Sequence, residues 1–246
     1  MTTLCFDFGN TRLKCGVFTD ALLTQVFALY DDNDSTIEDI LIRYTPDKTI
    51  LSSVIDHNPS VENILAQKNA FHRLGYQTVL PFTTPVGKPE TIGADRLALS
   101  AAAVHFYAGK NNLVIGLGSC ITFNFINKFN SFLGGSISPG MEMRFKAMNT
   151  FTAKLPLIKA VSQSSMWNFP LVGYDTRTNM ISGVILGMAS EIDGIIDRYK
   201  EKYDNLNILL TGGDASYFTP FLKNKIIVDA DLIFKGLYAI SEVNNK

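Results

Sequence analysis

The residue types best suited to chemistry begin with an acid at the end of an apolar run. Asp7 lies in the expected strand Thr3–Phe8 and is followed by Gly9-Asn10-Thr11, with Lys14 close behind. A glycine leaves room for a ligand to approach the backbone, and N–H groups in such turns hold anions. Lys14 adds a positive charge, and a carboxylate beside phosphates commonly holds Mg²⁺. The segment predicts a phosphate-binding loop, although an ordinary polar turn has the same composition.

A second acid stands where a loop gives way to a helix. Gly93-Ala94-Asp95-Arg96 follows a segment rich in proline and glycine and precedes an alanine-rich helical pattern. Asp95 could accept a proton from a substrate hydroxyl as that oxygen attacks phosphorus. Arg96 has the planar fork that suits a carboxylate. The alternative is structural, because Asp is common at helix starts as a cap.

Two further motifs could bind a nucleotide, and each is weak alone. Gly116-Leu117-Gly118-Ser119, with Thr122, has the composition of a second phosphate loop. Thr211-Gly212-Gly213-Asp214 follows a short apolar run, and its paired glycines would admit a flat ring or a ribose. The histidines are scattered without the spacing of metal ligands.

The elements that must position these residues follow an α/β pattern. Strand–turn–strand is expected over 3–18 and again over 113–126, each time followed by strand and helix signals. This repeat predicts two related halves, 1–107 and 108–246, although strand–turn–strand can recur by chance. The other expected elements are helices at 35–44, 60–67, 94–107, 141–153, 178–199 and 232–243, strands at 48–54 and 207–210, and loops at 81–93 and 134–140.

Composition narrows the classes of function. The 246 residues carry 22 Lys and Arg against 23 Asp and Glu, which argues against a nucleic-acid binder or a charge-driven membrane binder. Three cysteines without disulfide spacing indicate reduced thiols, and neither a secretory signal nor a run of apolar residues long enough to span a membrane is visible. We therefore expect a cytoplasmic protein with no membrane partner. Trp167 is expected to serve packing.

Four motifs in order resemble one enzyme family. Asp7–Lys14 resembles the Asp-x-Gly-Asn-Thr-x-x-Lys start of type III pantothenate kinases, and Gly93–Arg96 resembles their Gly-x-Asp-Arg motif. Gly134–Gly140 and Thr152–Pro156 resemble the family's Gly-Gly-x-Ile-x-Pro-Gly and Thr-Ala-x-Leu-Pro stretches. The family belongs to the actin-like ATPase superfamily. The resemblance therefore implies two ribonuclease H-like halves with a cleft between them.

The resemblance also implies a reaction and its residues. The family phosphorylates pantothenate with ATP, the first step toward coenzyme A, and is dimeric. It uses Mg²⁺ and a monovalent cation such as K⁺ or NH₄⁺. Asp95 would be the catalytic base, and Asp7 would be the Mg²⁺ ligand. The implied ATP-binding residues are Asp7, Phe8, Gly9, Asn10, Thr11, Arg12, Leu13, Lys14 and Ser119, and the implied pantothenate-binding residues are Gly93, Ala94, Asp95, Arg96 and Thr176.

The sequence departs from the family pattern at four positions. The acid that would bind the monovalent cation falls on Gly116, a further acid falls on Asn124, and a tyrosine that contacts pantothenate falls on Val86. Ser119 replaces a threonine but keeps the hydroxyl. These departures leave two alternatives beside pantothenate kinase. One is a nucleotide-binding relative without turnover, such as the members labelled Bvg accessory factors, and the other is a kinase of another small alcohol.

Overall fold

The computed structural model describes residues 1–68, 70–159 and 169–244, which form two compact units. Unit 1 contains residues 1–112, 124–134 and 231–246, and unit 2 contains residues 113–123 and 135–230. Each unit is described by itself below. Trp167 lies outside the described residues.

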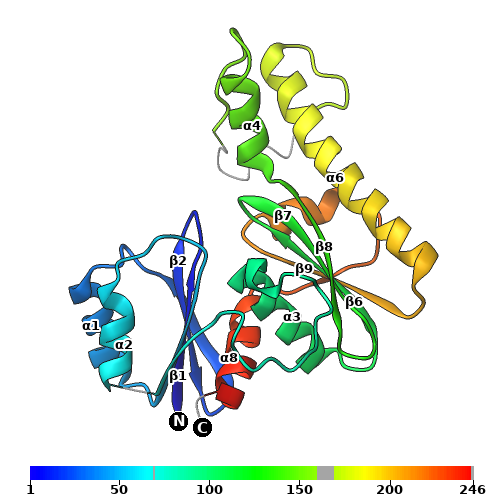
Figure 1. The fold of residues 1–246 in the computed structure, drawn as a ribbon. Coiled ribbons are helices and arrows are strands. Elements are labelled where there is room, and N and C mark those ends of the chain that lie inside the picture. The colour runs from blue at the N-terminus through cyan, green and yellow to red at the C-terminus, as the bar shows by residue number, and fades with distance from the viewer. Residues whose placement is uncertain (69, 160–168, 245–246) are drawn as a thin grey trace. The chain divides into compact units, whose positions relative to one another are not determined.

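The first sheet has five strands in the order β3-β2-β1-β4-β5. Its strands β1 and β2 are labelled in Figure 1. They are β1 (Thr2–Phe8), β2 (Leu13–Thr19), β3 (Leu22–Ala28), β4 (Lys48–Ser53) and β5 (Ala70–Arg73). β1 and β2 form the expected antiparallel hairpin, whereas β1–β4 and β4–β5 pair in parallel. The sequence analysis did not predict β3 or β5. Both are edge strands with mostly exposed or half-buried side chains, so their apolar pattern is weak.

The two faces of this sheet have different coverings. Leu4, Phe6 and Phe8 share a buried core with helices α1 (Asp34–Tyr44) and α2 (Ser60–Lys68). Because successive side chains of a strand alternate between faces, Thr3, Cys5 and Asp7 point to the other face. Helix α8 (Leu232–Asn244) packs against β1 and β4.

Helix α3 (Ala94–Phe106) packs closely against α8 within unit 1. A Cβ on Gly236 of α8 would lie 1.9 Å from the carbonyl oxygen of Ala98, so a side chain at residue 236 would push the helices apart. The alanines of α3 provide the flat surface that this approach needs. Residues 231–246 thus group in space with unit 1, whereas the sequence repeat divides the chain at 107/108.

The second sheet repeats the order of the first. Its strands are β6 (Asn111–Leu117), β7 (Cys120–Ile126), β8 (Phe132–Pro139), β9 (Leu206–Thr211) and β10 (Ile227–Val228). Their order β10-β9-β6-β7-β8 equals β5-β4-β1-β2-β3 when each strand is matched to its counterpart in the first sheet. The prediction of an α/β fold with two similar halves is therefore confirmed.

One expected loop is part of a strand. Residues 134–140 were predicted to be a loop from their glycine and serine content, but all except Gly140 belong to β8. Gly134 and Gly135 have φ of 96° and 155°, which glycine tolerates without strain. β8 is an edge strand with several exposed side chains, and an edge accommodates glycines that would weaken a central strand.

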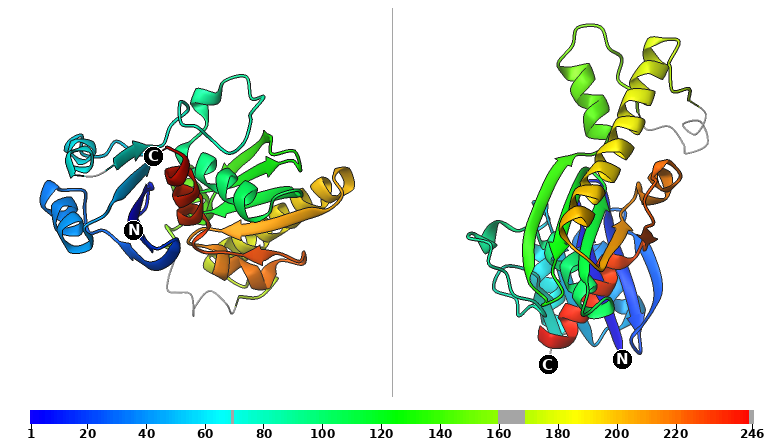
Figure 2. Two further views of the ribbon diagram at one scale, coloured as in Figure 1. Left: turned by 90° about the horizontal axis from the view of Figure 1, so that it is seen from below. Right: turned by 90° about the vertical axis from the view of Figure 1, so that its right-hand side faces the viewer.

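Two helices of unit 2 lie side by side and reach beyond the end of its strands (Figures 1 and 2). They are α4 (Met141–Thr150) and α6 (Thr176–Lys202), which are joined by an ion pair between Arg144 and Glu191. α6 is long and apolar enough to cross a membrane, but 56% of its apolar stretch is buried inside the protein. Its burial is that of a helix packed within the protein, and a capping box between Asp175 and Thr178 closes its N-terminus.

Candidate active site

The first phosphate loop connects β1 to β2 within unit 1. Asp7 is the penultimate residue of β1 and pairs with Lys14 in the antiparallel register. The Gly9 N–H donates to the Arg12 carbonyl oxygen at 3.1 Å and closes the turn. A pocket of about 260 Å³ lies at this turn. Its lining residues are Gly9, Asn10, Thr11, Arg12, Leu13, Ala28, Leu29, Tyr30 and Ile55.

Asp7 is a carboxyl group in an unusual environment. Burial raises its pKa from 3.8 to about 7, because the charged form loses hydration. The charge of Asp95 raises the pKa further, and the charge of Lys14 opposes the rise. Unit 1 therefore brings the two predicted acids close enough to interact. A buried acid with a pKa near neutrality is typical of a functional site.

Asp95 occupies the second position of α3. Its Oδ1 accepts a hydrogen bond of 2.8 Å from the Arg96 N–H. A Cβ on Gly93 would lie 2.6 Å from the same Oδ1, so a side chain at residue 93 would require the Asp95 carboxylate to move. Burial raises the pKa of Asp95, while the hydrogen bond and the charge of Arg96 lower it. The N-cap residue of α3 is Gly93, so Asp95 is not the N-cap of this helix.

Arg96 is held in place by groups from β7 and β8. Its Nε donates to Oδ1 of Asn124 at 2.6 Å, and its guanidinium carbon lies 5.6 Å from the centre of the Phe132 ring. Asn124 is fully buried. This partner of Arg96 was missed by the sequence analysis, although one signal for it was present. Asn124 is a polar residue between Phe123 and Phe125 in the expected strand 121–126.

The loop before Gly93 is fastened to the start of β8. The Thr83 N–H donates to Asn130, and the Phe132 N–H donates to Thr83, at 3.0 and 2.8 Å. Val86, at the position of the family's tyrosine, is half-buried and carries neither a ring nor a hydroxyl. A Cβ on Gly134 would lie 3.9 Å from Val86. Here Val86 can offer only apolar contact.

The second phosphate loop is a shorter turn in unit 2. Its Gly118 N–H donates to the Cys120 carbonyl oxygen at 3.1 Å. A Cβ on Gly140 would lie 2.1 Å from the Gly118 carbonyl oxygen, and one on Gly212 would lie 2.1 Å from that of Leu117. The sequence analysis interpreted Gly212 as space for a ring or a ribose. In the structure this space is taken by the backbone of residue 117, whereas Gly213 faces open space.

Thr176 begins α6 and its side chain is exposed. It lies next to Asp175, the N-cap residue, whose side chain accepts from the Thr178 N–H at 2.7 Å. A Cβ on Gly173 would lie 2.4 Å from the Asn179 side-chain oxygen. The segment Gly173–Thr176 thus has a structural role in starting α6, and the Thr176 side chain remains exposed to solvent.

The residues present fit Mg²⁺ but do not fit the monovalent cation. Mg²⁺ usually takes one or two carboxylates plus phosphate oxygens and waters, and Asp7 and Asp95 supply two carboxyl groups in unit 1. The described part of the chain has no cluster of three or more His, Cys, Asp or Glu side chains. A Mg²⁺ site that is completed by phosphate oxygens and waters does not need such a cluster. At the other position, Gly116 has no side chain to offer a cation.

Comparison with known proteins gives a consistent result. The profile of the family "Type III pantothenate kinase" matches residues 3–198. The type III pantothenate kinase of Christiangramia forsetii is 38% identical over 243 residues and that of Cytophaga hutchinsonii is 39% identical over 244 residues. The alignments cover 98% of this chain in both cases, and 98% and 99% of those relatives.

Two solved structures share the fold. A Baf-family protein from Campylobacter jejuni, described as a transcriptional activator, gives a TM-score of 0.59 at 24% identity, with 98% of both chains covered. Component A of the (R)-2-hydroxyglutaryl-CoA dehydratase of Acidaminococcus fermentans gives 0.54 at 13% identity, with 100% of this chain and 98% of that chain covered. At these identities the likeness concerns the fold. The family profile and the two pantothenate kinases at 38% and 39% identity show that this chain belongs to the type III pantothenate kinase family.

Proposed function

We propose that this chain transfers the γ-phosphoryl group of ATP to the primary alcohol of pantothenate and forms 4'-phosphopantothenate. The observation that carries the proposal is the arrangement at the start of α3. Asp95 and the Asn124-held Arg96 stand side by side, and the Asp95 charge acts on Asp7. In this proposal unit 1 would supply a base for the alcohol, a cation for the pantothenate carboxylate and an acid for the metal–nucleotide complex.

The proposed chemistry is mainly positioning and charge neutralisation, as in other phosphoryl transfers. Asp95 would hold the substrate hydroxyl through a hydrogen bond and accept its proton as the oxygen attacks phosphorus. The hydrogen bond from Arg96 N–H favours the ionised form of Asp95, which is the form that can act as base. Arg96 would bind the pantothenate carboxylate through its remaining N–H groups.

ATP would be bound by Asp7–Lys14 and, as the resemblance implies, by Ser119 in unit 2. The N–H groups of the first loop and Lys14 suit phosphate oxygens. Asp7 would hold Mg²⁺, which when bound neutralises phosphate charge. We derive no step through K⁺ or NH₄⁺, because Gly116 lacks the carboxylate that would bind it.

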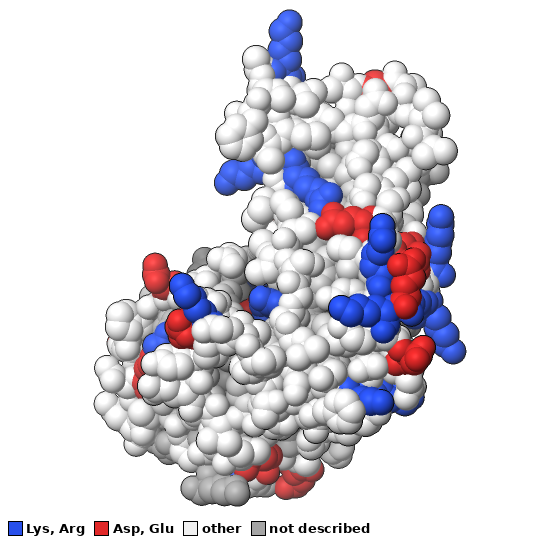
Figure 3. Space-filling view, turned by 45° about the vertical axis from the view of Figure 1, so that its right-hand side comes forward, with Lys and Arg blue, Asp and Glu red and all other residues white. Residues whose placement is uncertain are grey.

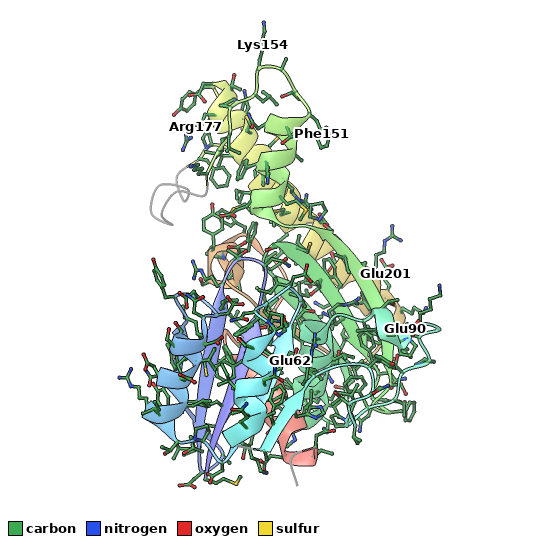
Figure 4. The ribbon with its side chains drawn as sticks, turned by 60° about the vertical axis from the view of Figure 1, so that its left-hand side comes forward. Glu62, Glu90, Phe151, Lys154, Arg177 and Glu201 are labelled. Atoms are coloured by element: carbon green, nitrogen blue, oxygen red, sulfur yellow. The ribbon has the colours of Figure 1, made fainter. Side chains whose placement is uncertain are left out.

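We further propose a cytoplasmic homodimer whose interface includes the α4–α6 end of unit 2. Large apolar side chains are exposed there, among them Phe151, Leu171, Val172 and Tyr174, which are 85, 79, 80 and 82% exposed. The α4–α6 end is mostly uncharged on the face drawn in Figure 3. Figure 4 places Phe151 and Arg177 at this end. An apolar surface of this extent typically marks an interaction site, and pairing through it would bring Thr176 to the partner.

The direct experiment is a coupled assay of ADP release by the purified chain with MgATP, with and without pantothenate. Pantothenate-dependent ADP release supports the proposal, and its absence at millimolar substrate contradicts it. A panel of related alcohols in the same assay tests whether another small alcohol is preferred. ATP binding without turnover would favour a non-catalytic relative. No observation in the structure favours that alternative over the kinase.

A further inference from the structure

One buried hydroxyl beside Asp7 has no assigned role. Ser52 is the penultimate residue of β4 and is 0% exposed, and its Oγ has no hydrogen-bond partner among the described residues. Leaving a buried hydroxyl unpaired costs free energy, so such groups are rare and call for an explanation. An alanine at residue 52 would fill nearly the same volume without this cost.

The register of the sheet places Ser52 next to Asp7. In the parallel β1–β4 pair, Ser52 is the Cα partner of Asp7, and Ile50 is the partner of Cys5. Paired residues on neighbouring parallel strands point to the same face, and the strands lie about 4.8 Å apart. A rotation about the Ser52 Cα–Cβ bond can therefore bring Oγ within hydrogen-bond distance of a carboxylate oxygen of Asp7.

The neighbouring serine has a different environment. Ser53 is the partner of Phe8, on the face covered by α1 and α2, and its Oγ lies 2.9 Å from Nδ1 of His57. His57 in turn contacts Glu62 of α2 through Nε2 at 3.1 Å. Ser53 is therefore satisfied within the protein's own structure. Ser52, one residue earlier, is directed to the face of Asp7.

We propose that Ser52 is a positioning residue for Asp7: its hydroxyl donates a hydrogen bond to the Asp7 carboxylate when that carboxylate holds the metal–nucleotide complex. The inference rests on the proposed kinase function. One carboxylate oxygen then faces the metal while the hydroxyl fixes the other. The unpaired Oγ of the unliganded chain is a donor kept ready for this state.

Thr3 offers a matched control on the same strand pair. It is 1% exposed, its Oγ1 also lacks a partner among the residues that the structure describes, and it shares the face of Asp7. It stands at the other end of β1, paired with Lys48. Thr3→Val removes a buried unpaired hydroxyl at nearly constant shape. If such hydroxyls matter only for stability, Thr3→Val and Ser52→Ala should behave alike.

The experiment compares Ser52→Ala, Thr3→Val and wild type in two assays and in thermal unfolding. The first assay measures Mn²⁺ binding in the presence of ADP through the decrease in the electron paramagnetic resonance signal of free Mn²⁺. It needs neither pantothenate nor turnover. For Ser52→Ala we expect an affinity and a kcat/KM for MgATP about 10- to 100-fold lower, the usual effect of losing a hydrogen bond to a charged group. The Tm of Ser52→Ala should equal or exceed that of the wild type. Thr3→Val should change only the Tm. Ser52→Thr keeps a hydroxyl and should therefore retain most of the wild-type Mn²⁺ affinity.

A double variant tests whether the effect runs through Asp7. In the Asp7→Asn background, Ser52→Ala should cause no further loss of Mn²⁺ affinity. Wild-type Mn²⁺ affinity in Ser52→Ala, or an equal loss in both backgrounds, would overturn the inference. A wild-type chain that binds Mn²⁺ and ADP without pantothenate-dependent turnover would instead count against the proposed function, and the Mn²⁺ results would still decide the role of Ser52.

Discussion

The two phosphate loops follow strands that match position by position. β1 and β6 each have seven residues with the same succession of buried and half-buried side chains. The penultimate residue is Asp7 in β1 and Gly116 in β6, and the residue after each strand is glycine. The two matching strands thus carry an acid at this position in β1 and no side chain at the same position in β6.

The difference shows that the same backbone unit can serve two purposes. The first loop is charged, with Asp7 beside Lys14 and an Asp95 charge nearby. The second loop is uncharged and closely packed, because the backbones of Gly140 and Gly212 approach it directly. We expect it to supply neutral contacts and to hold the neighbouring backbone in place. We therefore place the reacting groups in the first half of the chain.

The largest effect is expected at Asp95. Asp95→Asn keeps the shape of the side chain but removes the base, so kcat should fall by about 100- to 10,000-fold. ATP binding should change little, because Asp95 acts on the alcohol. The coupled assay and nucleotide titration measure both quantities. Glu90→Gln, an exposed acid in the preceding turn, is the control and should remain active. Full activity of Asp95→Asn would remove Asp95 as base.

Substitutions in the two loops should have unequal effects. Asp7→Asn removes the proposed Mg²⁺ ligand and should lower kcat/KM for MgATP by at least about 100-fold, since metal–carboxylate contacts are strong and direct. Ser119→Ala removes one neutral hydroxyl and should cost only about 3- to 10-fold. Steady-state kinetics at varied MgATP test the comparison. Equal losses of kcat/KM in Asp7→Asn and Ser119→Ala would show that the two loops contribute equally to the use of MgATP.

The orientation of Arg96 gives a prediction of intermediate size. Asn124→Ala removes the acceptor of Arg96 Nε, so the guanidinium should lose its fixed direction. The KM for pantothenate should rise by about 10-fold, the usual effect of losing one buried hydrogen bond, while the KM for ATP stays the same. Asn124→Asp keeps an acceptor and serves as control. A rise in the KM for ATP alone would contradict this role.

The raised pKa of Asp7 predicts how stability depends on pH. In the folded chain the carboxyl keeps its proton up to about pH 7, whereas in the unfolded chain it loses it near 3.8. The folded state then binds more protons over this interval, so the contribution of Asp7 to stability falls as pH rises. The Tm of Asp7→Asn relative to wild type should rise between about pH 4 and pH 7, the interval between the two pKa values, and then level off.

Asp20 provides the opposite case for the same measurement. The N-terminal amino group, 2.8 Å away, lowers the pKa of Asp20, so its contribution is lost as pH falls. The Tm of Asp20→Asn relative to wild type should therefore not rise toward pH 8. A pH-independent difference for Asp7→Asn would show that Asp7 ionises normally.

The smallest effect is expected from monovalent cations. Because Gly116 supplies no carboxylate, replacing Na⁺ with K⁺ or NH₄⁺ should change kcat by less than about 2-fold, which corresponds to less than RT in free energy. Gly116→Asp would introduce the missing acid, and Gly116→Ala controls for added bulk. Gly116→Asp should make turnover more dependent on K⁺. A strong K⁺ dependence of the wild type would show that another group holds the cation.

Sequence patterns predicted the parts of this fold that depend on local signals. The hairpin at Asp7, the start of α3 at Asp95 and the repeat at Leu113 follow from apolar runs and turn residues, and the order of motifs predicted the family. The strands β3, β5 and β8 were not predicted. They lie at sheet edges, where side chains are exposed and the apolar alternation is weak.

The sequence could predict individual candidate residues from their side-chain chemistry, but not the contacts between them. The interaction of Asp95 with Asp7, the contact of Asn124 with Arg96 and the pairing of Ser52 with Asp7 join residues far apart in the sequence. These depend on strand order and register, which a single sequence does not reveal. Gly212 was interpreted as part of a ligand site because the sequence does not show which backbone approaches it.

In this account the chain phosphorylates pantothenate with ATP through Asp7 and Asp95, although its second loop is uncharged. The most direct test of this claim is to mix the wild-type chain with MgATP and pantothenate and to quantify ADP and 4'-phosphopantothenate over time. We predict that both products form in equal amounts and that both form at least about 100-fold more slowly with Asp95→Asn. ATP binding with no pantothenate-dependent product would contradict the claim.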